Sequence, residues 1–179
     1  MSARGGPNLV HPKATYLPDA PDLVVLSGDF SPYHEATITL EERFRAERAI
    51  RVMAVACVRD HQKNVAGHLD FTPGSIKLID EILTRVKLGT YDEHSTRTFV
   101  AELGSYIGGV VESESFGTEI KVTWHTCPLY YFSALRIRTK SNRTLEANPF
   151  AWVTKRLVDK EGEVALFPKF QVLWEKAQE

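Results

Sequence analysis

Hydrophobic residues recur at steps of three to four along residues 39–89, the spacing that places apolar side chains on one face of a helix. The first predicted helix starts at a capping box of Thr39 and Glu42 and runs to about residue 65, where Gly67 stops it. A second helix follows the threonine-proline pair at 72–73 and ends before residue 89. The first helix is expected to bury Leu40, Phe44, Ile50, Met53, Cys57 and Val58.

A third predicted helix carries glycines on one side only. It begins at a Thr96 cap, after a polar loop over residues 90–95. On a helical wheel one arc is bulky (Phe99, Leu103, Tyr106, Ile107, Val110 and Val111) and the other is small: Ala101, Gly104, Ser105, Gly108 and Gly109. An interior glycine costs about 1 kcal/mol relative to alanine. We therefore expect a buried central helix whose small side lets a neighbour come close, with the sheet lying across it.

After residue 117 apolar and polar residues alternate, which is typical of strands. Two antiparallel strands are predicted, one over residues 120–125 and one ending at Arg138, and Leu145 begins a third, short strand. An edge strand is predicted earlier, at Leu23–Leu26. Asn148 followed by proline starts a further helix, and a terminal helix follows Pro168.

These elements predict an α+β fold in which long amphipathic helices pack on a small antiparallel sheet, with helices at the C-terminus. Residues 1–22 contain four prolines and a glycine pair, a composition that disfavours both helix and sheet, so we expect an extended or mobile tail there. Residues 23–179 are expected to form a single α+β domain, because this length is ordinary for one core.

The composition is that of a globular protein, with 43% hydrophobic and 25% charged residues and a net charge of -1. The near-neutral total gives no global attraction to nucleic acid or membrane. No stretch is apolar enough to span a bilayer, the N-terminus lacks the apolar core of a secretory signal, and the two cysteines form no disulfide pattern. We therefore expect a cytoplasmic protein with reduced thiols and no membrane partner.

Three short motifs occur in order within residues 69–170: Leu69-Asp70-Phe71-Thr72-Pro73, Gly104-Ser105-Tyr106-Ile107-Gly108 and Asn148-Pro149-Phe150. With these motifs, of the forms LD[FY][ST]P, GxY[IL]G and NPF, the stretch resembles a bacterial domain-of-unknown-function family. The resemblance implies a helix-rich first part and a small sheet, and it brings no established reaction, cofactor or catalytic residue. Some relatives resemble accessory or immunity-type proteins, which implies binding rather than catalysis. Gly109 stands where the family usually has glutamate, so no role of that carboxylate is carried over.

The usual chemical signatures are missing from the sequence. His125 and Cys127 supply only half of a tetrahedral zinc site, and no other pair has the spacing to complete it. Cys57 falls on an apolar helix face, where an inert buried thiol is expected. There is no G-x-S-x-G nucleophile motif and no phosphate-binding loop. We therefore predict no catalytic residue, no metal and no cofactor, and a protein that is more plausibly not an enzyme.

Charge is distributed unevenly along the chain. Residues 80–119 hold eight acidic and three basic residues, a balance of -5, whereas residues 120–160 hold eight basic and two acidic residues, a balance of +6. Arginines interleaved with aromatic residues at the second strand suit an interface, and we predict binding through Tyr130, Tyr131, Arg136 and Arg138. The predicted function is an accessory, adaptor or immunity-type protein that binds another protein with an acidic surface. Charges that merely protect a sheet edge from aggregation are the alternative interpretation of the same pattern.

A second hypothesis is a small-molecule enzyme or ligand-binding domain with a pocket over the glycine side of the third helix, using Tyr106, Trp124 and His125. A single-stranded nucleic-acid binder is a third hypothesis, which the neutral net charge disfavours. The sequence leaves the partner, the pathway and homo-oligomerisation open.

Overall fold

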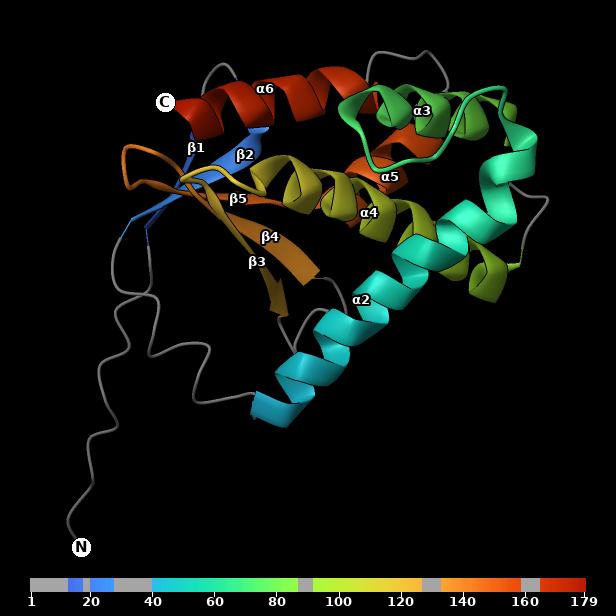
Figure 1. Cartoon of the computed structure of the whole chain (residues 1–179), viewed down its shortest axis with the longest axis horizontal. Helices are drawn as coiled ribbons and strands as arrows, with labels where there is room; N and C mark the ends of the chain where they lie inside the picture. The colour runs from blue at the N-terminus through green and yellow to red at the C-terminus, as the bar shows by residue number, and fades with distance from the viewer. Residues whose placement is uncertain (1–12, 18–19, 28–39, 87–91, 127–132, 159–164) are drawn as a thin grey trace, which may run out of the picture.

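The computed structural model describes residues 13–17, 20–27, 40–86, 92–126, 133–158 and 165–179, and it shows helices packed against one face of an antiparallel sheet (Figure 1). The sheet comprises β1 (Lys13–Leu17), β2 (Ala20–Ser27), β3 (Lys121–Thr126), β4 (Ser133–Arg138) and β5 (Thr144–Ala147). The strand order is β1-β2-β5-β4-β3, and each neighbouring pair is antiparallel. The predicted α+β class is confirmed.

The N-terminal part of the sheet corrects two expectations. We expected residues 1–22 to avoid sheet structure, but β1 and the start of β2 lie there and pair with each other. The predicted edge strand at 23–26 belongs to β2, which is an inner strand between β1 and β5. Proline misled the prediction, because Pro12 and Pro18 flank β1 in the sequence and Pro21 stands second in β2, and a proline at the start of a strand is tolerated.

The described helices are α2 (Leu40–His61), α3 (Ile76–Arg85), α4 (Glu93–Ser115), α5 (Pro149–Val158) and α6 (Leu166–Gln178). Short 3-10 turns, η1 (Gln62–Asn64) and η2 (Pro73–Ser75), follow α2 and precede α3. All five helices were expected from the spacing. Residue 39, the proposed cap of α2, lies outside the described residues.

Helix α4 begins earlier than predicted. The cap is Asp92, whose carboxylate accepts a hydrogen bond from the Ser95 amide at 2.7 Å, while Thr96 lies inside the first turn and its hydroxyl donates to the Asp92 carbonyl at 2.9 Å. Aspartate and threonine are both good caps, so residue type alone does not favour the upstream one. At α5 the expected cap is confirmed, since Asn148 Oδ1 accepts the Ala151 amide at 3.0 Å.

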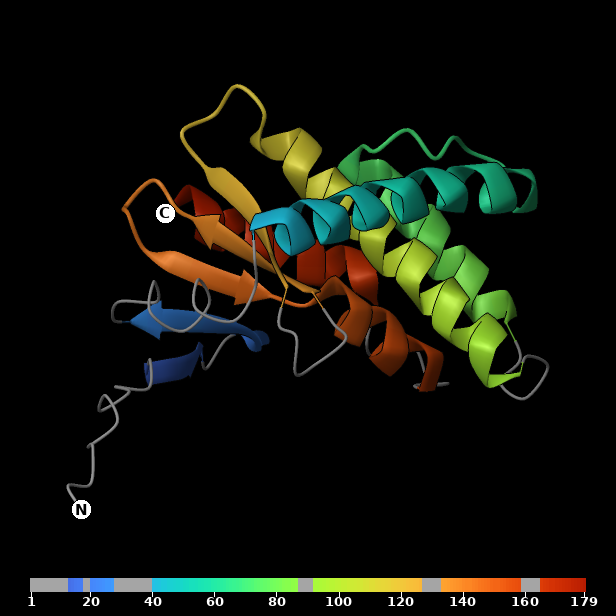
Figure 2. The same cartoon turned by 90° about the horizontal axis from the view of Figure 1, so that it is seen from below.

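Helix α4 is the centre of the molecule, packed against α2, α5 and β3 (Figures 1 and 2). Leu103, Tyr106, Ile107, Val110 and Val111 are all 0% exposed, and Gly104, Ser105 and Gly108 on the opposite side are buried too. The buried central helix that the glycine pattern predicts is therefore confirmed.

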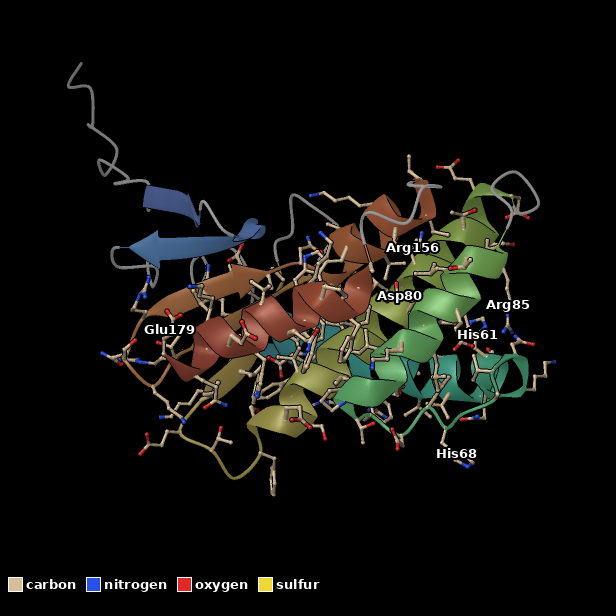
Figure 3. The ribbon with its side chains drawn as sticks, turned by 90° about the horizontal axis from the view of Figure 1, so that it is seen from above. His61, His68, Asp80, Arg85, Arg156 and Glu179 are labelled. Carbon is tan, nitrogen blue, oxygen red and sulfur yellow. The ribbon has the colours of Figure 1, made fainter. Side chains whose placement is uncertain are left out.

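Helices α3, α5 and α6 are joined through Asp80 (Figure 3). Its carboxylate accepts the backbone amides of Leu166 at 3.0 Å and Phe167 at 3.2 Å, so α3 caps the N-terminus of α6, which has no side-chain cap of its own. Arg156 of α5 places its Nε 3.5 Å from Asp80 and donates through Nη2 to the hydroxyl of Thr84 at 2.9 Å. One carboxylate thus fixes the relative positions of three helices.

Candidate functional site

The glycine side of α4 is filled by aromatic rings. A Cβ on Gly104 would overlap the Phe150 ring and lie 3.0 Å from the Phe150 Cα, and one on Gly109 would lie 2.9 Å from the Phe71 ring. A Cβ on Gly108 would overlap the six-membered ring of Trp124. The sheet does lie across this side, as expected, through Trp124 of β3.

This packing bears on the pocket hypothesis. The floor of the proposed pocket is covered by Phe71, Trp124 and Phe150, and Trp124 itself is only 3% exposed. Tyr106 points to the other arc of α4 and is 0% exposed. Tyr106 and Trp124, two of the three residues that the pocket hypothesis uses, are therefore core residues, and a ligand has no access to them. Their aromatic character alone could not distinguish a rim from a core.

The Tyr106 hydroxyl fixes the loop before α3. It donates a hydrogen bond to Ser75 Oγ at 2.6 Å and accepts one from the Phe71 amide at 3.1 Å. The rings of Tyr106 and Phe71 stack with their centroids 4.6 Å apart. Burial raises the pKa of this phenol above its ordinary value. Phe71 has a positive φ of 60°, an uncommon conformation for a large side chain. The Tyr106 contacts hold that conformation in place, so they serve the fold.

The sheet has one buried face and one partly exposed face. Leu135 and Ile137 of β4 are 0% exposed, and Leu145 and Ala147 of β5 are 1% and 2% exposed. Their alternate neighbours along each strand point the other way. We call this second surface the open sheet face; on β3, β4 and β5 it comprises the exposed residues Lys121, Thr123 and Arg138 and the half-buried residues His125, Ala134, Arg136, Thr144 and Glu146.

Two of the predicted binding residues, Arg136 and Arg138, lie on the open sheet face. Arg136 is partly committed to the fold, because its Nε lies 3.3 Å from Glu146 on the neighbouring strand. Arg138 is exposed and donates to the side-chain oxygen of Asn142. The other two predicted residues, Tyr130 and Tyr131, and the second cysteine, Cys127, lie outside the described residues. The basic part of the predicted surface is thus brought together, with one arginine already paired.

The arrangement of cations on this face lowers the stability of the sheet in the free protein. Lys121 of β3 stands directly opposite Arg138 of β4, and both side chains are exposed. Like charges at opposite positions of an antiparallel pair destabilise the sheet. Within the described chain no carboxylate pairs with Lys121, and the side-chain partner of Arg138 is a neutral amide. These two cations are available to an external anion.

Cys57, His61 and Glu102 meet where α2 packs on α4. His61 Nε2 lies 3.0 Å from Glu102 Oε2, with the side chains 14% and 10% exposed, and the imidazole edge meets Phe99. Burial, and then the negative charges of Glu102 and Asp60, raise the pKa of the Cys57 thiol far above its ordinary value. A nucleophilic cysteine needs a lowered pKa and access. The predicted burial of the Cys57 thiol is confirmed, and the cluster is a contact between two helices.

Sequence reasoning missed an exposed surface on α2. Phe44 was expected on the buried side of this helix, but its side chain is 62% exposed, and Val52 and Val55 on the same outer face are 59% and 64% exposed. The face forms a shallow groove lined also by Glu47, Arg48, Arg51, Ala56 and Arg59. A signal for this exposed surface was present in the sequence, because Val52 and Val55 fall on the same side of the helix as the arginines at 48, 51 and 59.

No family model, curated protein or solved structure matches this chain. The bacterial family suggested by the three motifs stays a prediction. Among the described residues no group of three histidine, cysteine or acidic side chains is placed to hold a metal ion, and no helix there is long and apolar enough to cross a membrane.

Proposed function

We propose that this protein binds an acidic surface of another protein with its open sheet face. The observation that carries the proposal is the cross-strand pair of Lys121 and Arg138, two exposed cations placed opposite each other. Such a pair costs stability in the free protein, and a carboxylate between the two cations would remove the repulsion. Arg136 lies in the next row along β4 on the same face, where it is paired with Glu146.

The size of the positive surface favours protein over nucleic acid. Lys121, Arg136 and Arg138 are its cations on β3 and β4, and Glu146 already offsets one of them. Nucleic-acid binding usually depends on many phosphate contacts, and the chain as a whole has a net charge of -1. A few positioned cations suit recognition of a carboxylate-rich protein patch. The resemblance to accessory and immunity-type domains points in the same direction.

A charge-reversal experiment tests the proposal. The full chain and its Lys121→Glu/Arg138→Glu variant are titrated against a fluorescently labelled polyglutamate peptide, with anisotropy as the measurement. We expect at least a tenfold loss of affinity in the variant, and binding by the wild type that weakens as salt is raised, because exposed charges are screened. The matched control is Arg97→Glu, which reverses a 77% exposed arginine on α4 and should bind like the wild type.

Three results would contradict the proposal. They are equal binding by the wild type and the double variant, an equal loss in Arg97→Glu, and tighter binding of a single-stranded oligonucleotide than of the peptide. Circular dichroism of each variant establishes that the fold is retained. A photo-crosslinking amino acid at Thr123, which is exposed on the same face opposite Arg136, would then capture the natural partner.

A further inference from the structure

Most of the exposed large apolar residues of the described chain lie on one helix, α2. Five large hydrophobic side chains are exposed: Phe44 at 62%, Val52 at 59%, Val55 at 64%, Phe116 at 92% and Val158 at 67%. Three of them lie on the outer face of α2, and the most exposed one follows the end of α4. We call the first patch the α2 stripe (Phe44, Arg48, Arg51, Val52, Val55 and Arg59) and the second the Phe116 turn (residues 112–119).

Helix α2 is apolar on two opposite sides. Ile50, Ala54 and Cys57 face the core at 8%, 5% and 0% exposure, and the apolar residues of the α2 stripe are centred about 145° away around the helix. A helix on a protein surface normally has one apolar side. The second apolar side is a contiguous groove that runs for about 24 Å along the helix. Such a surface is characteristic of an interaction site.

The Phe116 turn is a fixed projection. Phe116 is the C-cap of α4, its amide donates to the Ser113 carbonyl at 3.2 Å, and Gly117 takes a positive φ of 77° to reverse the chain. The Thr118 hydroxyl donates to the Ser115 carbonyl at 2.8 Å and so closes the turn. An aromatic side chain held out on a rigid turn loses little conformational entropy on binding, which is the property of an anchor residue.

The two patches have opposite charge. The α2 groove is lined by Arg48, Arg51 and Arg59, with Glu47 as its acidic member. The Phe116 turn holds three carboxylates and no cation: Glu112, Glu114 and Glu119. Within the described residues no ion pair involves Arg48, Glu114 or Glu119. The aromatic, acidic turn therefore matches the apolar, basic groove in both polarity and charge.

The patches also adjoin each other on one side of the molecule. Arg51 at the border of the stripe lies 3.6 Å from Glu112, which is one helical turn before Phe116. Figure 2 shows α2 running across α4 on the side of the molecule that faces the viewer. When two complementary patches lie on one side of a protein, each patch can bind the other patch of a second copy. The two contacts are then related by a two-fold axis, and the assembly is closed as a dimer.

We infer that two copies of this chain form a closed dimer in which the Phe116 turn of each protomer docks on the α2 stripe of the other. Phe116 would lie among Phe44, Val52 and Val55, and the carboxylates of the turn would face the arginines of the stripe. One helix face and one turn per protomer make a small interface, so a micromolar dissociation constant is expected rather than an obligate dimer. This inference concerns a surface separate from the open sheet face and does not depend on the function proposed for it.

Sedimentation velocity of the full chain over a range of micromolar concentrations tests the dimer. We expect the wild type to pass from monomer to dimer, and Val55→Glu and Phe116→Ser each to weaken association at least tenfold. Both positions are exposed, so both variants should keep the fold, and thermal melting checks this. The control is Val158→Glu, which changes an equally exposed valine on α5 and should dimerise like the wild type.

Mixing the two variants tests reciprocity. Phe116→Ser keeps an intact stripe and Val55→Glu keeps an intact turn, so a mixed dimer contains one complete contact and should form more strongly than either variant alone. A wild type that remains monomeric throughout would overturn the inference. So would dimerisation that neither substitution weakens, a mixture no stronger than its components, or growth into open-ended oligomers. A monomeric wild type that sediments with anionic vesicles in a stripe-dependent manner would assign the stripe to a lipid surface and would likewise overturn the dimer.

Discussion

Replacing Gly108 by alanine tests whether the aromatic packing of α4 is the reason for its glycines. Helix propensity alone predicts that this substitution stabilises the protein by about 1 kcal/mol. The structure predicts the opposite sign, because the new methyl group would overlap two ring carbons of Trp124 and lie 3.3 Å from a third. Trp124 is 3% exposed and packs against Phe150 with ring centroids 5.9 Å apart, so the indole cannot move outward without disturbing α5.

The magnitude follows from these two opposing effects. Overpacking a buried site costs about 1–3 kcal/mol and more when the neighbour is held rigidly, and the overlap at Gly108 is severe. After subtraction of the propensity gain we expect Gly108→Ala to lower the free energy of unfolding by about 2 kcal/mol. For a chain of this size that corresponds to a fall in Tm of about 4–8 °C.

Urea unfolding followed by tryptophan fluorescence measures the effect, and Gly74→Ala is the matched control. A Cβ on Gly74 would have its nearest neighbour at 3.9 Å, so alanine there should be neutral or slightly stabilising. Trp124→Phe in combination with Gly108→Ala should show favourable coupling, since the smaller ring leaves room for the methyl group. The explanation is refuted if Gly108→Ala is as stable as the wild type, or if its cost is unchanged by Trp124→Phe.

Three further outcomes follow from named contacts. Asp80→Asn should lower the free energy of unfolding by about 2 kcal/mol, measured by urea unfolding, because charged hydrogen bonds to the α6 amides are lost; retained stability would show that the α6 cap is dispensable. Lys121→Glu alone should raise stability by about 0.2–1 kcal/mol, because it turns a repulsive cross-strand pair with Arg138 into an attractive one, and a fall would contradict the pairing. In a Cys127→Ser background, the Cys57 thiol of the folded protein should resist Ellman's reagent at neutral and mildly alkaline pH, because burial raises its pKa. The same thiol should react fully in urea. Rapid reaction in the folded protein would contradict its burial.

The helices were predictable because their signals are local. Apolar spacing, proline at a first turn and the glycine pattern of α4 each depend on neighbouring residues, and the helices that they predict are present in the structure. The start of α4 shows the limit of such signals, since Asp92 and Thr96 are equally acceptable caps by residue type and the tertiary fold selects between them.

Contacts between distant residues could not be read from the sequence. Nothing near Asp80 indicates that its carboxylate caps a helix 86 residues later. The same holds for Tyr106 and Trp124, whose burial depends on partners from η2, α5 and the sheet. An aromatic residue next to a glycine is compatible with both a pocket rim and a packed core, and only the arrangement of elements decides between them.

Three features of this chain cost free energy where they occur: the glycines inside α4, the opposed cations Lys121 and Arg138, and the exposed apolar stripe on α2. The first cost is offset inside the fold, because Phe71, Trp124 and Phe150 fill the space that the glycines leave. Within the described residues no comparable contact offsets the second or the third. A sequence that is otherwise consistent with its fold usually departs from local stability where it serves function. Partners outside the protomer, an acidic protein at the sheet and a second copy at α2, would offset both remaining costs.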